Sequence, residues 1–254
     1  MTTVSLRVGS RMSALAMWQT KRVVSLLESA WPQLICEIIP YNTKGDRTLD
    51  KALPAIGGKG LFTAELEAAL RNDVIDIAVH SLKDLPVDNA PGTQLGAISD
   101  RADVRDCLVA CNGWTLNTLP QGAVVGTSST RRQAQLLSSR PDLIVRSIRG
   151  NVETRIHKVL EDELYHATIL AAAGVRRLEK QAVVTEWLST QQLLPAPGQA
   201  ALAIQCREGD EQTRDLLSAI HSQEAADAIT AERTFLSALG GGCSSPVAAY
   251  ARWD

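Results

Sequence analysis

The segment HSLKDLP, residues 80–86, combines the side chains in this sequence that are best suited to chemistry. It follows an apolar run at residues 75–79 that predicts a buried strand, so it lies at the carboxyl end of that strand. Open α/β sheets bind ligands at this edge. Lys83 and Asp84, side by side, can bind an anion and move a proton. A surface turn with a solvated Lys–Asp pair is the alternative interpretation.

Arginines recur where predicted strands give way to predicted helices. They are Arg11, Arg131, Arg132, Arg149, Arg155 and Arg177. Helix N-termini favour anions through their free backbone N–H groups and their dipole. Guanidinium groups bind carboxylates through paired hydrogen bonds. The repeated placement predicts a ligand with many carboxylates, although each arginine taken alone fits an ordinary surface position.

Cys243 lies in the segment GGGCSSP, where three glycines strip away neighbouring side chains. An accessible thiolate there is a good nucleophile, and an incidental cysteine in a flexible loop is the alternative. The odd total of five cysteines argues against a disulfide framework. None of them forms a CxxC pair or stands at zinc-like spacing from a histidine, so no metal site is predicted.

The composition is that of an ordinary globular protein. The chain has 254 residues, 45% of them hydrophobic and 21% charged, with a net charge of -2. This charge and the scarcity of aromatic residues disfavour nucleic acid and anionic membranes as partners. The N-terminus lacks a signal-peptide pattern, and no apolar run reaches the roughly 18 residues of a membrane span. We therefore expect a cytoplasmic protein.

Short β-rich runs alternate with helical patterns, which is typical of α/β domains with largely parallel sheets. The strands predicted are residues 4–8, 35–41, 75–79, 107–110, 123–126, 143–147, 168–172, 200–206 and 247–250. The helices predicted are residues 13–30, 61–71, 129–138, 151–161 and 225–239, with Ser13 as the N-cap of the first.

A shift in composition near Asp100, at the charged segment DRADVRD, indicates a domain boundary. We predict a first lobe from residues 1–99 and 200–218, because the strand at 200–206 is expected to return to it. Residues 100–199 form a second lobe and residues 219–254 part of a third domain. Such an arrangement places a ligand between the lobes.

Ten segments in order resemble the hydroxymethylbilane synthase (porphobilinogen deaminase) family, and they cover nearly the whole chain. They are GSRMSALAMWQ, NTKGDRTLD, GGKGLF, DIAVHSLKDLP, VGTSSTRRQAQL, VRSIRGN, NVETR, AAAGVRRL, PAPGQAALAIQCR and GGGCSSPV. The resemblance implies an α/β fold of two periplasmic-binding-protein-like lobes. Their sheets are mixed and mainly parallel, and a small C-terminal α/β domain follows.

The resemblance also implies a reaction. The family is a group of transferases of heme biosynthesis that condense four porphobilinogen molecules with loss of ammonia. The chain grows on a dipyrromethane primer held by a thioether, and water finally releases hydroxymethylbilane. The substrate pyrroles carry acetate and propionate groups, which matches the carboxylate-rich ligand expected from the arginines. A cytoplasmic monomer that binds a small molecule is the corresponding expectation.

The family's functional positions can be carried over residue by residue. Asp84 matches the catalytic acid and Cys243 the residue that carries dipyrromethane. The cofactor-binding matches are Lys83, Ser81, Asp46, Lys59, Thr127, Ser129, Arg131, Arg132 and Gln199. The substrate-binding matches are Arg11, Ser13, Arg149, Asn151, Arg155 and Arg177.

Two departures from the family pattern affect these expectations. Ala55 stands where the family often has a lysine, which removes one anion contact. The chain ends at Asp254, where the family's third domain normally continues, so that domain is expected to be shortened. A catalytically impaired fragment of the family and, from another class, a two-lobed solute-binding module are the alternatives.

Overall fold

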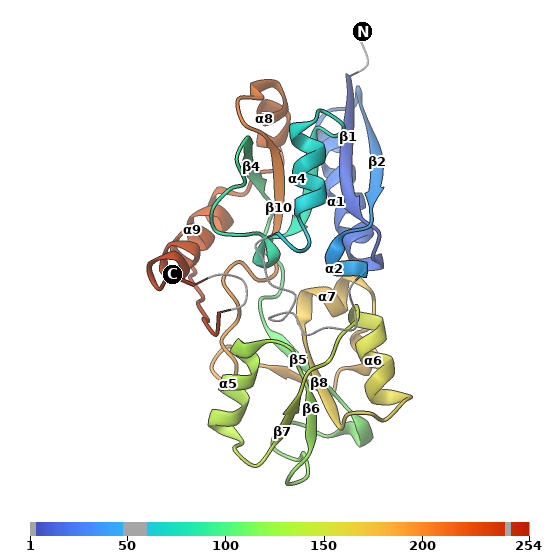
Figure 1. Ribbon diagram of the computed structural model, residues 1–254, viewed down its shortest axis with the longest axis vertical. Helices are drawn as coiled ribbons and strands as arrows, with labels where there is room; N and C mark the ends of the chain where they lie inside the picture. The colour runs from blue at the N-terminus through green and yellow to red at the C-terminus, as the bar shows by residue number, and fades with distance from the viewer. Residues whose placement is uncertain (1–3, 48–59, 242–244, 254) are drawn as a thin grey trace.

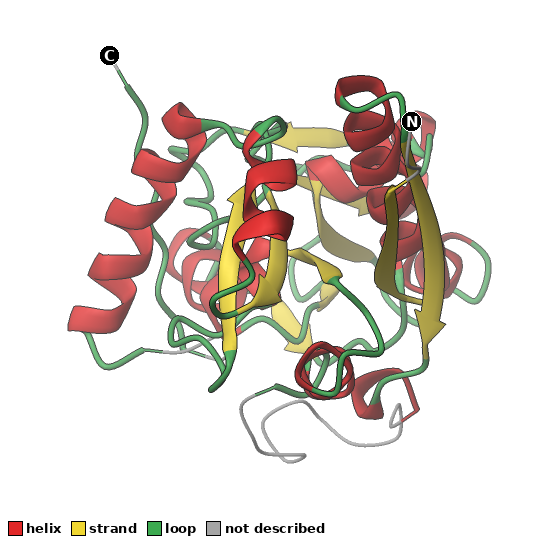
Figure 2. Cartoon of the chain, turned by 90° about the horizontal axis from the view of Figure 1, so that it is seen from above, coloured by secondary structure: helices red, strands yellow, loops and turns green. Residues whose placement is uncertain are grey.

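The computed structural model describes residues 4–47, 60–241 and 245–253, which form two lobes stacked along the long axis of the molecule (Figure 1). Each lobe has a five-stranded sheet among the described residues. Seen from above, the helices lie around the strands (Figure 2). Two of the residues expected at the site, Lys59 and Cys243, lie outside the described residues, as does Ala55.

The first sheet contains, in order, β2 (Leu34–Tyr41), β1 (Val4–Arg11), β3 (Ile77–Ser81), β10 (Leu202–Arg207) and β4 (Thr93–Ile98). β1 pairs in parallel with β2 and β3, whereas β10 runs antiparallel to β3 and β4. The segment predicted to return from the end of the second lobe contains β10, which lies between β3 and β4 in this sheet.

The second sheet contains, in order, β7 (Ile144–Arg146), β6 (Val124–Gly126), β8 (Ala167–Ala171), β5 (Asp106–Ala110) and β9 (Glu186–Leu188). β6 pairs in parallel with β7 and β8, whereas β5 runs antiparallel to β8 and β9. In both sheets four strands run one way and one runs the other. The expected mixed, mainly parallel α/β fold is confirmed.

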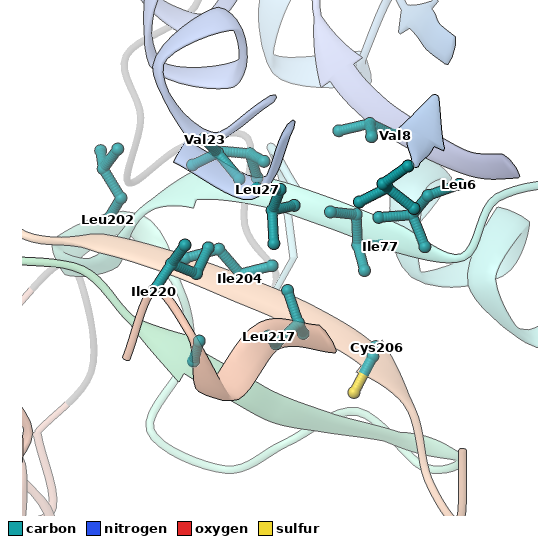
Figure 3. Packing of buried hydrophobic residues seen from close by; sticks show 13 residues of the cluster. Leu6, Val8, Val23, Leu27, Ile77, Leu202, Ile204, Cys206, Leu217 and Ile220 are labelled. Carbon is teal, nitrogen blue, oxygen red and sulfur yellow. The ribbon is translucent and has the colours of Figure 1, made fainter. Parts of the chain in front are cut away.

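Apolar side chains alternate between the two faces of the first sheet. Val23 and Leu27 of α1 (Ala14–Ala30) pack with Ile77 on one face, together with Leu217 of α8 (Glu211–Ser218) (Figure 3). Residues of α4 (Ala64–Arg71) cover Ala78 on the other face. β3 is thus covered on both sides, which explains why its sequence is a continuous apolar run.

Polar residues begin the helices at the predicted places. Ser13 caps α1, Ser129 caps α5 (Thr130–Ser139) and Asn151 caps α6 (Val152–Leu160), each accepting a bond from a backbone N–H of the first turn. The N-cap predicted at Ser13 is confirmed. Other helical segments are α2 (Lys44–Arg47), α7 (Ala172–Arg177), η1 (Leu82–Asp84), η2 (Cys111–Gly113) and η3 (Gln181–Val183).

The last helix, α9 (Gln223–Ala238), lies beside the first lobe (Figure 1). Ala225 and Ile229 pack with Leu82, Leu85 and other residues of the first lobe. None of the helices in the described ranges is long and apolar enough to cross a membrane.

Some expected elements differ from the structure. The strand predicted at residues 247–250 is wrong, because this segment is irregular. The backbone bond from Ala249 N to Pro195 O, 3.2 Å, does not extend into a ladder. β4, β9, α7 and α8 were not predicted. The strand expected at residues 75–79 is Ile77–Ser81, since the apolar pattern includes Ile75, which packs with α4 before the ladder begins.

Candidate active site

The turn that carries Lys83 and Asp84 follows directly from its local sequence. Leu82 and Leu85 are buried, so the two polar residues between them stay half-buried at the end of β3. Leu85 is extended, with φ −83° and ψ 130°, as expected for a residue before proline. Pro86 therefore ends η1 directly after Asp84. The preceding His80 is buried, and this burial lowers its pKa to about 4, so the imidazole stays neutral.

Lys83 is held near several other charges. Its Nζ donates to Oε1 of Gln199 at 3.3 Å. Burial, reinforced by the charge of Arg132, lowers the pKa of Lys83 to about 8, although Asp84 and Asp106 act in the opposite direction. Lys83 is therefore a cation at neutral pH that loses its proton in mildly alkaline solution.

Arg155 lies on the opposite lobe but within electrostatic reach of Asp84. Burial, followed by the charges of Arg132 and Arg149, lowers the pKa of Arg155 to about 10, and the charge of Asp84 opposes this. The Arg155 side chain is directed by a bond from its Nε to the carbonyl of Gly150, at 2.8 Å. The carboxylate of Asp84 thus faces cations from both lobes.

Arg131 and Arg132 are buried around one carboxylate that the sequence analysis did not single out. Asp106 is fully buried, and its two oxygens accept from Nη2 of Arg131 and of Arg132, both at 2.7 Å. Burial alone would raise the pKa of Asp106, but the charges of Arg132 and Arg131 hold it well below its ordinary range. The negative charge of Asp106 therefore partly neutralises the two arginines.

Gln199 connects this buried cluster to the turn of the first lobe. It is fully buried, and its Nε2 donates to Asp106 Oδ1 at 3.0 Å and to the carbonyl of Val104 at 2.7 Å. Its Oε1 accepts from Lys83. A continuous set of hydrogen bonds therefore joins Lys83 in the first lobe to Asp106 and its arginines in the second.

The other predicted residues of the second lobe lie around the starts of α5 and α6. Thr127 is buried, and its hydroxyl accepts from the backbone N–H of Ser129, the N-cap of α5, at 3.2 Å. Asn151 caps α6 and is exposed. Arg149 is half-buried, and burial lowers its pKa. These residues belong to the same strand-to-helix edge as Arg132 and Arg155.

Arg11 and Asp46 form a pair at the end of β1. Arg11 donates through Nε to Oδ2 of Asp46 at 3.1 Å and also through Nη2, and it lies over the ring of Phe62. Burial alone would raise the pKa of Asp46, but the bonds from Arg11 and Thr43 bring it below its ordinary value. This pair is nearly self-neutralised.

Ser13, Ser81 and Arg177 have structural contacts of their own. Ser13 caps α1, and the hydroxyl of Ser81 accepts from Nε2 of Gln19 at 2.8 Å. Arg177 donates to the carbonyl of Ala200 at 2.7 Å and lies over the ring of Trp18. Burial lowers the pKa of Arg177 to about 10. Arg177 thereby links α7 of the second lobe to the first.

The arrangement defines what the site can do chemically. Lys83, Arg132, Arg149 and Arg155 provide cations, while Asp84 and Asp106 are the carboxylates identified among them. The excess positive charge suits a ligand with several carboxylates. Asp84 can hold or transfer a proton and stabilise a cation that forms beside it.

Asp106 is the main residue that the sequence reasoning missed. It belongs to the charged segment DRADVRD, which the sequence analysis interpreted only as a domain boundary. One signal was available, since Asp106 directly precedes the apolar residues 107–110, and β5 is buried throughout. An acidic residue at the start of a fully buried strand needs a buried partner.

The described cysteines differ from the expected properties of Cys243. Cys107 and Cys206 are buried, and Cys36 and Cys111 are half-buried. Burial raises the pKa of Cys107 to about 12 and that of Cys36 to about 11. Such thiols are poor nucleophiles at neutral pH. Within the described ranges, no group of three or more His, Cys, Asp or Glu side chains is arranged to hold a metal ion.

The fold is shared with two-lobed ligand-binding proteins. A crystal structure of the methionine-binding protein MetQ matches with a TM-score of 0.51 and 13% identity, covering 90% of this chain and 96% of that one. The BenM effector-binding domain matches with a TM-score of 0.50 and 14% identity, covering 94% and 95%. The chain therefore has the periplasmic-binding-protein-like architecture.

The sequence comparisons identify the family. Residues 6–215 match the family model "Porphobilinogen deaminase, dipyromethane cofactor binding domain" and residues 226–254 match "Porphobilinogen deaminase, C-terminal domain". Porphobilinogen deaminase of Syntrophotalea carbinolica is 49% identical over 99% of this chain and 79% of its own length. That of Bacillus subtilis is 50% identical over 97% and 78%. The chain belongs to the porphobilinogen deaminase family.

Proposed function

We propose that this chain is a cytoplasmic, monomeric transferase that condenses four porphobilinogen molecules on a covalent dipyrromethane primer and releases hydroxymethylbilane. The observation that carries the proposal is the position of Asp84. It stands at a strand end within electrostatic reach of Lys83 and Arg155, one cation from each lobe. Family membership supplies the substrate, and this geometry supplies a way to process it.

The residues present fit a dipyrromethane cofactor. Its pyrroles carry carboxylate side chains, and the site has an excess of guanidinium and ammonium groups. Nε of Arg132 is buried and has no hydrogen-bond partner among the described residues, so it can donate one more hydrogen bond. When bound, dipyrromethane supplies the pyrrole carbon to which the first substrate is joined. Lys83, Arg132 and Gln199 would hold its carboxylates and orient them.

Asp84 is proposed to act on the substrate. Loss of ammonia from porphobilinogen requires a proton at the leaving nitrogen and leaves a cation on the pyrrole. A half-buried carboxylate can deliver that proton and then, as an anion, stabilise the cation. Each condensation afterwards releases a proton from the pyrrole carbon, which Asp84 can take up. One carboxylate thus serves every round.

Arg149, Arg155, Arg11 and Arg177 are proposed to bind the carboxylates of incoming substrate, with Ser13 and Asn151 beside them. Arg149 and Arg155 suit this role because burial lowers the pKa of each guanidinium, and the charges of Arg132 and Arg149 lower that of Arg155 further, so a bound anion would relieve the repulsion on Arg155. Asp46, Ser81, Thr127 and Ser129 are proposed to support the primer through the groups that they orient. Lys59 and Cys243 keep their proposed roles as anion contact and primer attachment.

The test combines intact mass with product formation. The purified chain is incubated with porphobilinogen, and its mass is expected to increase by two linked pyrroles, with uroporphyrin appearing after oxidation of the product. Cys243→Ala should lose the mass increase, whereas Cys36→Ser, a matched change at a half-buried thiol, should keep it. A wild-type chain with no bound pyrrole and no uroporphyrin would refute the proposal. Bound pyrrole without uroporphyrin would instead favour the impaired-fragment alternative.

A further inference from the structure

Two consecutive residues of α9, Glu232 and Arg233, hold the turn of Asp84 from both sides. Glu232 is buried and Arg233 is half-buried. Neither was expected at the site from the sequence. Arg233 contacts backbone carbonyls of the segment that follows Asp84 in the sequence. Glu232 contacts a backbone N–H of another segment, which packs beside the turn.

Arg233 binds the segment that follows Asp84. Its Nη1 donates to the carbonyl of Leu85 at 3.2 Å, and its Nη2 donates to the carbonyls of Pro86 at 2.6 Å and Val87 at 3.0 Å. This segment lies outside any strand, so its carbonyls lack a ladder partner. The guanidinium fork gathers all three at once. The chain directly after Asp84 is thereby attached to α9.

Glu232 binds the segment that supports the other side of the turn. It is held by Arg101 at 2.7 and 2.9 Å, and its Oε2 accepts from the backbone N–H of Gly198 at 2.7 Å. Gly198 has φ +73°, and a Cβ there would lie 2.2 Å from Cδ2 of Leu82. The backbone at Gly198 therefore presses directly on η1, and the next residue, Gln199, accepts from Lys83.

Apolar packing alone does not orient this turn. Leu82 and Leu85 pack with Ala225, Ala226 and Ile229 of α9, which fixes how deeply the turn sits. Hydrophobic burial is non-directional, whereas hydrogen bonds to three carbonyls are directional. Backbone bonds from Leu82 N to the carbonyl of Ala201, at 3.1 Å, and from Leu85 N to the carbonyl of Leu82, at 3.0 Å, hold the turn itself. Arg233 adds the directional contacts to the chain that leaves Asp84.

We propose that Arg233 is a positioning residue for Asp84, acting through the carbonyls of residues 85–87. The inference rests on the proposed function, in which Asp84 transfers protons. In sequence, α9 leads into the glycine segment that carries Cys243. One helix therefore connects the segment that bears the acid with the segment that bears the thiol.

The first test is Arg233→Met in the primer-loaded enzyme. We expect kcat to fall by about 10²-fold, because small misplacements of a reacting group have effects of that order. KM for porphobilinogen should stay within about threefold, because the cations that bind substrate are untouched. Arg233→Lys keeps a cation that can donate to the carbonyls, so it should recover about tenfold of the lost kcat.

Arg140→Met is the matched control. Arg140 also donates to loop carbonyls, those of Leu116 at 2.5 Å and Leu119 at 3.0 Å, but it does so in the second lobe and beside Asp142. Its loss should lower Tm by an amount similar to that of Arg233→Met and leave kcat unchanged. A purely structural role for Arg233 would make the two variants alike.

Hydrogen exchange gives a readout that does not require turnover. In Arg233→Met, amides of residues 82–88 should exchange faster, while those of β10 stay protected. The proposal is overturned if Arg233→Met matches Arg140→Met in kcat, or if exchange at residues 82–88 is unchanged. If Arg233→Met fails to fold, the same comparison is made with Arg233→Lys. A wild-type chain without turnover would refute the proposed function instead, and exchange would still test the contact.

Discussion

The two lobes share one framework and differ in charge. In both sheets three neighbouring strands run parallel to one another. The fourth strand runs antiparallel to the third, and the fifth, at the edge, runs antiparallel to the fourth. In the first lobe, Arg11 is paired with Asp46, and Lys83 stands next to Asp84. In the second, Arg131 and Arg132 are paired with the buried carboxylate of Asp106, and Arg155 lies within electrostatic reach of Arg132 and Arg149.

The first helices of the two sheets show where this difference arises. After its N-cap, α1 begins with Ala14, Leu15 and Ala16, whereas α5 begins with Thr130, Arg131 and Arg132. Cations are unfavourable at the positive end of a helix dipole, and burial increases the penalty. Asp106 offsets it by accepting from both guanidinium groups. Under the proposed function, the second lobe supplies most of the guanidinium groups that bind carboxylates, and the first supplies the Asp84 carboxylate that transfers protons.

The largest expected effect is the loss of turnover on changing Asp84 in the first lobe. Asp84→Ala should leave the fold intact and reduce turnover by about 10²–10⁴-fold, the range associated with a positioned acid or base. Steady-state rates and circular dichroism measure the two quantities. Asp215→Ala, at an exposed position on α8, is the control and should behave as wild type. A wild-type rate in Asp84→Ala would remove the assigned role from the first lobe.

The next largest effect is on the stability of the second lobe, at Asp106. Asp106→Asn leaves two buried guanidinium groups without a counter-charge, so the free energy of unfolding should fall by about 3–5 kcal/mol. Asp103→Asn, which affects the more exposed pair with Arg105, should change it by less than about 1 kcal/mol. Urea unfolding compares them. Equal losses in the two variants would contradict the idea that Asp106 is what makes the arginine cluster stable.

The smallest effect is a pH dependence that belongs to Lys83. Its pKa of about 8 means that it loses its positive charge as pH rises through that value. The rate constant kcat/KM for porphobilinogen should therefore fall by about 3–10-fold between pH 7 and pH 9, because the primer's carboxylates, which Lys83 is proposed to orient, lose one charged hydrogen bond. In Lys83→Arg the fall should be absent, because arginine stays charged. The same fall in both enzymes would assign the titration to another group.

Lys83 also affects stability, with a definite sign. The pKa is lowered from 10.5 to about 8 in the folded chain, so the unfolded chain binds more protons between these values. The free energy of unfolding should rise with pH across that window for this reason. Lys83→Met should show a smaller rise between pH 8 and pH 10, which urea unfolding at several pH values can measure.

Much of the fold was predictable from local patterns. Ser13, Ser129 and Asn151 stand at the expected helix starts, because a side chain that caps its own helix needs no distant partner. The strands β4 and β9 and the helix α8 were not predicted. Their own hydrophobic patterns are weak, and neighbouring elements bury them. The irregular segment at residues 247–250 shows the converse error, in which an apolar run lacks a strand partner.

The site, like the fold, was predictable only where the signal is local in the sequence. Asp84 could be singled out because the apolar strand before it and Pro86 after it are both local. Asp106 and Arg233 could not, because Asp106 lies 25 residues from Arg131 and Arg233 lies 148 residues from Leu85. Such pairings exist only after the two sheets and α9 have packed.

The sequence by itself determined the residue types at the strand ends, the caps that begin the helices and the family to which the chain belongs. Only the tertiary structure decided which arginines are compensated, which cations face Asp84 and which helix holds its turn. The physical reason is that capping and hydrophobic periodicity act within a few residues. The charge on a buried group depends instead on every group packed around it, whatever its distance along the chain.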